Sequence, residues 1–210
     1  MIIKSITQIK DKKDSFAALF DDGTEIKMSA AQIADFGIFS GRELSGDEYE
    51  ELRASISLSS AKARALRILG SRSLSAREIE RRLIGKGVSH ETAAQTVEWL
   101  KSIGIVNDAE YAASIVSYYS AKAYGNARIR DELFKRGIPR ELWDEAMNSS
   151  EETGDAAYEL LIKKLRGSRD KDELRRAADF LRRRGFSYEE ARSAVNNYLE
   201  KVEDAEDDEL

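Results

Sequence analysis

One short phrase occurs three times in this 210-residue chain at nearly constant spacing. It consists of a leucine, two variable residues, a basic residue, a glycine and an apolar residue, and it stands at 83–88, 133–138 and 181–186. The glycines lie 50 and 48 residues apart. A glycine just past a helix end supplies the left-handed residue that closes the helix, and the next apolar residue packs on the last turn. Three such helix ends predict an internal repeat of helical units.

Apolar residues flank each phrase at the spacing of one helix face. Ser75 and Ser187 are each followed three residues later by glutamate, which is the capping-box pattern of a helix start, and Asn107 and Asp170 begin related patterns. Pro139 stands where a helix would begin after the second phrase, because its missing N–H costs nothing there. Each unit is therefore predicted to hold three helices, at 60–70, 75–86 and 89–101, then 108–123, 126–136 and 139–148, then 151–166, 170–184 and 187–201.

The first 58 residues follow a different pattern. Two short runs, Ser15–Phe20 and Glu25–Met28, flank an Asp-Gly turn and predict a β-hairpin, and Asp47–Ile56 is expected to be helical. The predicted fold is mainly α: an elongated tandem array of three three-helix repeats behind a small β-containing module. The expected parts are the module at 1–58, repeats at 59–104, 105–149 and 150–202, and an acidic tail at 203–210.

Composition narrows the class of protein. The chain has no cysteine, so a disulfide framework and a thiolate metal site are excluded. No apolar run approaches the roughly 18–20 residues of a membrane span, and the first residues lack a signal-peptide pattern. With 35% charged residues and one proline, the sequence favours a helical protein of the cytoplasm that contacts no membrane. Nothing in it demands a dimer, so a monomer is expected.

Charge is unevenly distributed along the chain. Residues 1–59 and 201–210 are net acidic, whereas residues 60–200 are net positive. A repeated cationic face suits phosphates or an acidic protein partner, but basic residues near helix C-termini are also favoured by the helix dipole on an ordinary solvated face. The three adjacent arginines of the third repeat favour a binding role. The candidate binding residues, all on the predicted middle helices, are Arg77, Arg81, Arg82, Lys86, Arg128, Arg130, Lys135, Arg136, Arg175, Arg176, Arg182, Arg183 and Arg184.

The sequence offers little support for catalysis. His90 is the only histidine, and a zinc site or a histidine-based triad would need partners that are absent. Gly85–Gly87 lacks the residue order of a phosphate-binding loop and lies between helices. No enzyme, metal or cofactor is therefore predicted. Most aromatic residues fit core positions, but the adjacent Tyr118 and Tyr119 cannot both face one core, so one of them is a candidate contact residue.

Four stretches together resemble the RecX family of recombination regulators. They are Ser75–Gly87, Val106–Ala112, Tyr124–Gly137 and Phe180–Ser187, and the likeness extends over about residues 60–200. Residues 1–58 and the acidic tail carry no motif of the family. Val88 stands where the family more commonly has phenylalanine and still serves as the apolar cap contact.

The resemblance implies a non-enzymatic protein that binds along the RecA–DNA filament and takes part in DNA repair and the SOS response. It would modulate, mostly inhibit, ATP hydrolysis, strand exchange and filament growth by RecA. Single- or double-stranded DNA is a further candidate partner. Two alternatives stay open: a helix-turn-helix-like protein that binds DNA independently of RecA, and an interaction scaffold with some other protein partner.

Overall fold

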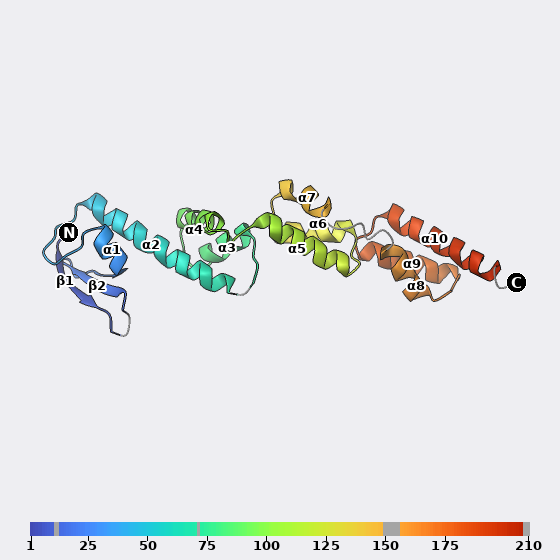
Figure 1. Cartoon of the computed structure of the whole chain (residues 1–210), viewed down its shortest axis with the longest axis horizontal. Coiled ribbons are helices and arrows are strands. Elements are labelled where there is room, and N and C mark those ends of the chain that lie inside the picture. Colours follow the sequence, from blue (N-terminus) through green and yellow to red (C-terminus); the bar gives the residue numbers. More distant parts are fainter. Residues whose placement is uncertain (11–12, 71, 149–155, 208–210) are drawn as a thin grey trace. The chain divides into compact units, whose positions relative to one another are not determined.

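The computed structural model describes residues 1–10, 13–70, 72–148 and 156–207. Figure 1 shows a small sheet near the N-terminus followed by helices. The chain divides into two compact units, of which the first comprises Met1–Arg72 and Ile79–Ile103. The second comprises Ser73–Glu78 and the described residues from Gly104 onward. Among the described helices, none combines the length and the apolar character needed to cross a membrane.

The N-terminal module is built on a three-stranded antiparallel sheet. Strands β1 (Ile3–Gln8), β2 (Ser15–Phe20) and β3 (Glu25–Ser29) lie in the order β1-β2-β3, and the short helix α1 (Ala30–Asp35) follows. The predicted hairpin is formed by β2 and β3, and β1 is a further strand that was not predicted. The sheet buries one face in a core that includes Ile3, Phe20 and Leu52.

The two helical segments expected at 47–56 and 60–70 form one continuous helix, α2 (Gly46–Leu69). The prediction of a break was wrong because residues 47–69 contain neither glycine nor proline, the residues that interrupt a helix. A capping box between Ser45 and Glu48 starts α2. Leu52 packs in the module and Ala65 is buried further along, so one helix serves both the module and the first repeat.

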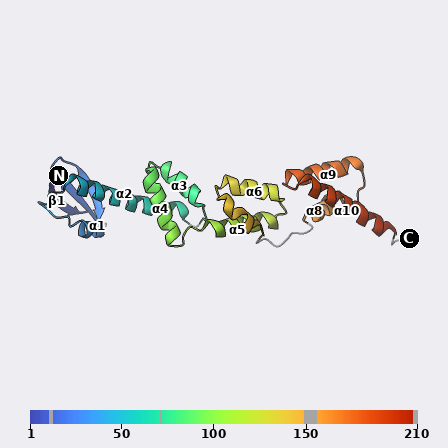
Figure 2. The same ribbon diagram turned by 90° about the horizontal axis from the view of Figure 1, so that it is seen from above.

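The three repeats follow the predicted pattern of helices, and Figure 2 shows them from a second direction. One difference is at Pro139, which precedes a 3₁₀ turn that leads into the last helix of the second repeat. The start of the helix expected at 151–166 falls on residues 149–155, which lie outside the described residues. The elements are α3 (Ala76–Ile84) and α4 (His90–Ser102); α5 (Asp108–Ala121), α6 (Asn126–Lys135), η1 (Arg140–Leu142) and α7 (Trp143–Asn148); and α8 (Ala156–Leu165), α9 (Lys171–Arg183) and α10 (Tyr188–Asp207).

The repeated phrase is a helix C-cap in all three repeats, as predicted. Gly87, Gly137 and Gly185 have φ values of +83°, +68° and +95°. After each glycine, the backbone N–H of the apolar residue donates to the carbonyl of the phrase's leucine at 3.1, 3.0 and 3.2 Å, which is the Schellman pattern. The three leucines are fully buried. The phrase therefore closes each middle helix and anchors it in the core of its repeat.

Candidate interaction surface

The middle helices of the second and third repeats meet end to end. The backbone N–H of Gly125 donates to the carbonyl of Arg184 at 3.0 Å, and that of Ala127 donates to the carbonyl of Gly185 at 3.1 Å. The C-terminal carbonyls of α9 thus accept from the N-terminal amides of α6, two sets of groups that a helix cannot satisfy internally. Opposite ends of the two helix dipoles also face each other, which is favourable.

The same arrangement recurs where α6 ends. The hydroxyl of Ser75 donates to the carbonyl of Arg136, and this serine also caps the first turn of α3 by accepting from the N–H of Glu78. The backbone N–H of Ala76 donates to the carboxylate of Asp108 at 2.9 Å. The C-terminal end of α6 therefore meets residues 75–78 at the start of α3. Residues 125–137 separate the two junctions by roughly 18 Å at the 1.5 Å rise of a helix.

Two of the predicted binding residues belong to these junctions. Arg136 lies 5.7 Å from the ring of Tyr111 and donates to its hydroxyl, and Arg184 lies 4.5 Å from the ring of Tyr124 and donates to the carbonyl of Lys122 at 2.7 Å. Both occupy the position before the cap glycine, and both are half-buried. Burial lowers the pKa of Arg136, but the attraction of Tyr111 and Glu78 outweighs it and leaves the pKa raised. The guanidinium group of Arg184 therefore joins the third repeat to the second, whereas that of Arg136 contacts Tyr111 within the second repeat.

Two more predicted residues form ion pairs within α6. Arg128 contacts Asp131 at 3.4 Å and Glu132 at 3.1 Å, and Lys135 contacts Asp131 at 2.7 Å. The hydrogen bond from Lys135 holds the pKa of Asp131 below its ordinary value and raises that of the lysine. Arg128 also packs against the cap of α9, since a Cβ on Gly185 would lie 2.5 Å from it. The charge of these two cations is therefore largely balanced locally.

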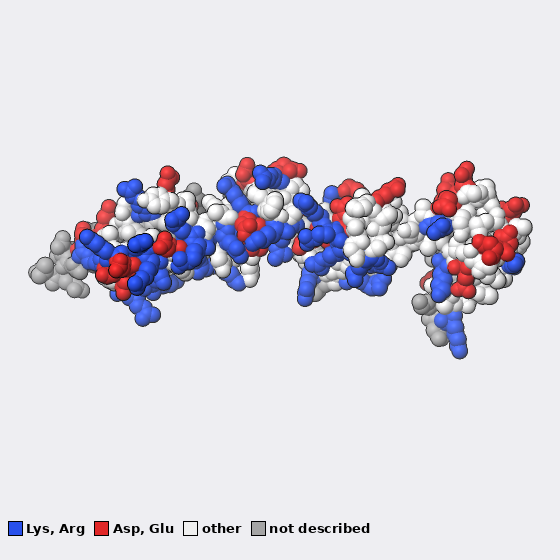
Figure 3. Space-filling view, turned by 180° about the vertical axis from the view of Figure 1, so that it is seen from behind, with Lys and Arg blue, Asp and Glu red and all other residues white. Residues whose placement is uncertain are grey.

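The remaining nine predicted residues are exposed and form no ion pair with any residue that the structure describes. Figure 3 shows basic side chains spread over one face of the molecule with acidic ones among them. In α9, Arg175 and Arg182 share one helix face because they are seven residues apart. Arg176 and Arg183 share the adjacent face for the same reason. On α3, Arg77 also packs its aliphatic part near Gly137. The nine residues, called the unpaired cations below, are Arg77, Arg81, Arg82, Lys86, Arg130, Arg175, Arg176, Arg182 and Arg183.

Two exposed aromatic residues lie near cations in the sequence: Tyr118, one of the two tyrosines named above as a candidate contact residue, and Phe134, which was not named. Tyr118 is 54% exposed with the ammonium group of Lys122 4.1 Å from its ring centre, whereas Tyr119 packs on the core of its repeat. Phe134 is 61% exposed and lies one helical turn after Arg130. The i, i+4 spacing of Tyr118 and Lys122 can be read from the sequence and could have indicated their contact.

His90 is the exposed first residue of α4. Over the described ranges, no group of three or more histidine, cysteine, aspartate or glutamate side chains is placed to hold a metal ion.

The fold and surface define a tandem three-helix-repeat protein with basic middle helices. Family models for the first, second and third three-helix domains of RecX match residues 61–100, 107–147 and 150–195. The chain belongs to the RecX family, a family of regulatory proteins.

The similarity to two of the following three relatives extends over 90% or more of this chain. The chain is 28% identical over 192 residues to "Regulatory protein RecX" of Caldanaerobacter subterraneus subsp. tengcongensis, covering 90% of this chain and 96% of the relative. It is 36% identical over 112 residues to the protein of that name from Pseudomonas putida, covering 52% and 72%. The protein of that name from Streptococcus gordonii is 27% identical over 208 residues, covering 97% and 80%.

Two solved structures share the fold. A crystal structure of regulatory protein RecX superposes with a TM-score of 0.73 at 20% identity, covering 93% of this chain and 98% of that one. A crystal structure of RecX from Lactobacillus salivarius gives 0.59 at 20% identity, covering 69% and 97%. The first match includes most of the chain, so the fold is shared well beyond the repeats.

Proposed function

We propose that this protein binds the RecA–DNA filament and modulates RecA, mostly by inhibiting its ATP hydrolysis, strand exchange and filament growth. It acts as a monomer in the cytoplasm, in recombination, DNA repair and the SOS response. The protein needs no nucleotide site, cofactor or metal of its own, because the ATPase that it controls is RecA.

The observation that carries the proposal is the set of unpaired cations, which recur on the middle helix of each of the three repeats. A repeat array presents similar surfaces at regular intervals, and a filament of identical subunits presents complementary surfaces at regular intervals. The unpaired cations of each middle helix are therefore expected to contribute to binding such a partner. Because a protein shifts an equilibrium by its differential affinity for two states, binding one filament state more tightly changes both assembly and turnover.

Among the candidate residues, the unpaired cations are assigned to filament contact and Arg136 and Arg184 to the junctions. A cation already paired with a carboxylate gains less from a new anionic partner, since the existing pair must be broken. Arg182 and Arg183 are thus expected to contribute more than Lys135, although all three belong to the same repeated phrase.

The test is ATP hydrolysis by RecA on single-stranded DNA, with this protein titrated well below one copy per RecA subunit. Strong inhibition at such ratios is expected. The double variant R182E/R183E should raise the concentration for half-inhibition about tenfold or more, and K135A, which removes a paired cation, should change it less than twofold. Charge reversal at both Arg130 and Arg182–Arg183 with inhibition and fold intact would refute the assigned contacts. No inhibition by the native protein up to equimolar amounts would refute the function.

An alternative is a protein that binds DNA independently of RecA. The observation in its favour is the exposed Tyr118 and Phe134 beside cations, because aromatic side chains stack on unpaired bases in single-stranded DNA complexes. This alternative predicts an affinity for bare DNA that equals the affinity for RecA filaments and falls steeply with salt. The pairing of the α6 cations with Asp131 and Glu132 weighs against it.

A further inference from the structure

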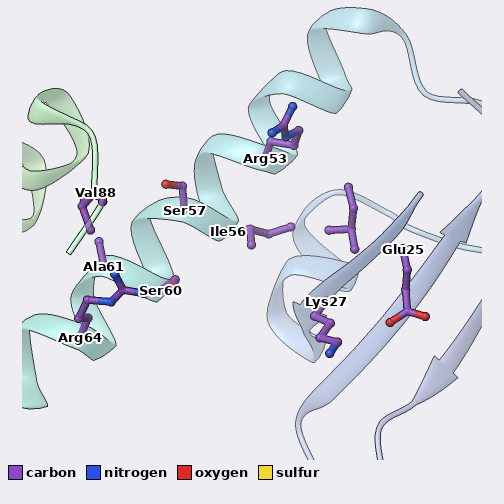
Figure 4. A pocket seen from close by; sticks show the side chains of 11 residues that line it. Glu25, Lys27, Arg53, Ile56, Ser57, Ser60, Ala61, Arg64 and Val88 are labelled. Atoms are coloured by element: carbon purple, nitrogen blue, oxygen red, sulfur yellow. The ribbon is translucent and has the colours of Figure 1, made fainter. Parts of the chain in front are cut away.

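A groove lies beside the N-terminal module. It has a volume of about 510 Å³ and is bounded by β3, α2 and the loop after α3. In Figure 4, Ile56 points from α2 toward the sheet, and Arg53, Ser57, Ser60 and Arg64 follow the same helix along the groove. All of these elements belong to the first compact unit.

Strand β3 has a free edge in this groove. The N–H of Phe20 donates to the carbonyl of Thr24, and the N–H of Ala30 donates to that of Asp14, which fixes the hydrogen-bonded pairs between β2 and β3. Because such pairs alternate along an antiparallel ladder, the backbone groups of Glu25 and Lys27 point away from β2. Among the described residues, no strand pairs with this edge.

The opposite edge of the sheet is covered. The N–H of Ile3 in β1 donates to the carbonyl of Arg42 at 2.9 Å, and the carbonyl of Ile3 accepts from the N–H of Gly41 at 2.8 Å. The hydroxyl of Ser40 donates to the carbonyl of Lys4. An exposed strand edge is a template for pairing with another extended chain, and proteins commonly blunt it. Among the described residues, the β1 edge is paired with the segment 40–42, whereas the β3 edge has no such backbone partner.

The groove combines an apolar floor with a positive rim. Ile26, Ile56, Ala61 and Val88 line the floor. On the rim, Lys27 and Arg64 form no ion pair with a described residue, and Arg53 approaches Glu50 only at 3.8 Å on the surface. Arg64 donates to the carbonyl of Lys86 at 2.6 Å, which fixes its guanidinium group at the end of the groove. The rim has one carboxylate, that of Glu25.

The loop that closes the groove is the C-cap of α3, whose Lys86 carbonyl accepts from the side chain of Arg64. A Cβ on Gly137 or Gly185 would collide with the neighbouring repeat, whereas one on Gly87 would meet no described atom within 4 Å. The C-cap of α3 thus presents an open surface at the position that receives a helix N-terminus in the other two repeats.

We propose that this groove binds an extended acidic segment of a protein partner, which adds as a fourth strand to β3. Main-chain hydrogen bonds to Glu25 and Lys27 supply affinity in such strand addition, and side-chain contacts supply selectivity. One set of alternate side chains of the bound segment faces Ile56, Arg53 and Arg64, and the other set lies beside Lys27. A free strand edge distinguishes a peptide from a nucleic acid, which has no backbone amides to pair with it.

The first test uses a fluorescein-labelled (Thr-Glu)₅ peptide and fluorescence anisotropy with the full-length protein. The double variant K27E/R53E should weaken binding at least tenfold, and R67E, a reversal on the same helix outside the groove, should change it less than twofold. The (Thr-Lys)₅ peptide should not bind. Equal affinity of the native protein and K27E/R53E would overturn the proposal, as would a loss of single-stranded DNA binding in K27E/R53E with peptide binding unchanged.

The second test isolates strand pairing from charge. Both E25A and E25P remove the one carboxylate of the rim, but E25P also removes the outward N–H at the first residue of β3, where proline is tolerated. E25A should bind the peptide more tightly than the native protein, and E25P at least fivefold more weakly than E25A. Equal affinity of the two variants would overturn strand addition. RecA inhibition, assayed separately, reports on the proposed function and not on the groove.

Discussion

The junction between the second and third repeats depends on the absence of a side chain at Gly125. A Cβ at this position would lie 2.3 Å from the backbone carbonyl of Gly185 and the nitrogen of Phe186. Backbone atoms cannot rotate away, so in G125A the ends of α6 and α9 must separate. Gly125 has a φ of −75°, which alanine adopts readily, so the substitution tests the contact without adding backbone strain.

The cost can be estimated from the bonds that are lost. Separation removes the two backbone hydrogen bonds of the junction and the bond from Arg184 to the carbonyl of Lys122. At about 0.5–1.5 kcal/mol for each neutral bond and about 1.5–3 kcal/mol for the charged one, the loss is roughly 2.5–6 kcal/mol, and these values already allow for rehydration of the freed groups. We therefore expect G125A to lower the unfolding free energy by about 2.5–6 kcal/mol.

The assay is urea unfolding followed by circular dichroism, together with amide hydrogen exchange at Ala127. In a repeat array, stability is approximately a sum of repeat and interface contributions, so a lost interface should also split the unfolding transition. The N–H of Ala127, which donates to Gly185, should lose its protection. G46A is the matched control, since a Cβ there meets no described atom within 4 Å. Equal stability of G125A and G46A, with Ala127 still protected, would refute the reasoning.

Three further predictions concern single side chains. R184K should destabilise the protein by about 1–2 kcal/mol in urea unfolding, because a lysine cannot reproduce the planar stacking on Tyr124; R183K, at an exposed position, should be neutral. N107A should cost about 1 kcal/mol by the same measurement, because the Asn107 side chain accepts from the N–H groups of Ala109 and Glu110, and an unchanged urea midpoint would contradict this. Hydrogen bonds from Ser45 and from Arg42 lower the pKa of Glu48 from 4.5, so its contribution to stability is present above that pH and is lost as pH falls through the lowered pKa. The urea midpoint of E48Q should therefore fall less than that of the native protein between about pH 6 and pH 3.5, and parallel curves would contradict the assignment.

The repeated phrase allowed much of the helical fold to be predicted. Leu83, Leu133 and Leu181 are fully buried and the glycine after each is left-handed, because a helix end and its core contact are both local in sequence. The break expected near residue 58 was wrong because residues 47–69 contain no glycine or proline to interrupt the helix. The serines there fit within it, and the hydroxyl of Ser59 donates to the carbonyl of Ser55 one turn earlier.

The roles of individual cations were less accessible from the sequence. Lys86, Arg136 and Arg184 occupy the same position of the phrase, yet the first is exposed while the other two stack on tyrosines. Those rings belong to segments 25 and 60 residues away, so their contacts depend on how helices pack. The free edge of β3 was equally inaccessible, since it depends on the order of strands in the sheet.

The continuity of α2 has a consequence for avidity. Its 24 residues span roughly 36 Å without a hinge residue, and they connect the groove side of the module to the core of the first repeat. A partner segment held on β3 is therefore presented at a fixed distance from the first repeat, with no flexible linker to order. Two weak contacts on the same partner would then reinforce each other through a high effective concentration when their spacing matches this helix, and would gain nothing when it does not.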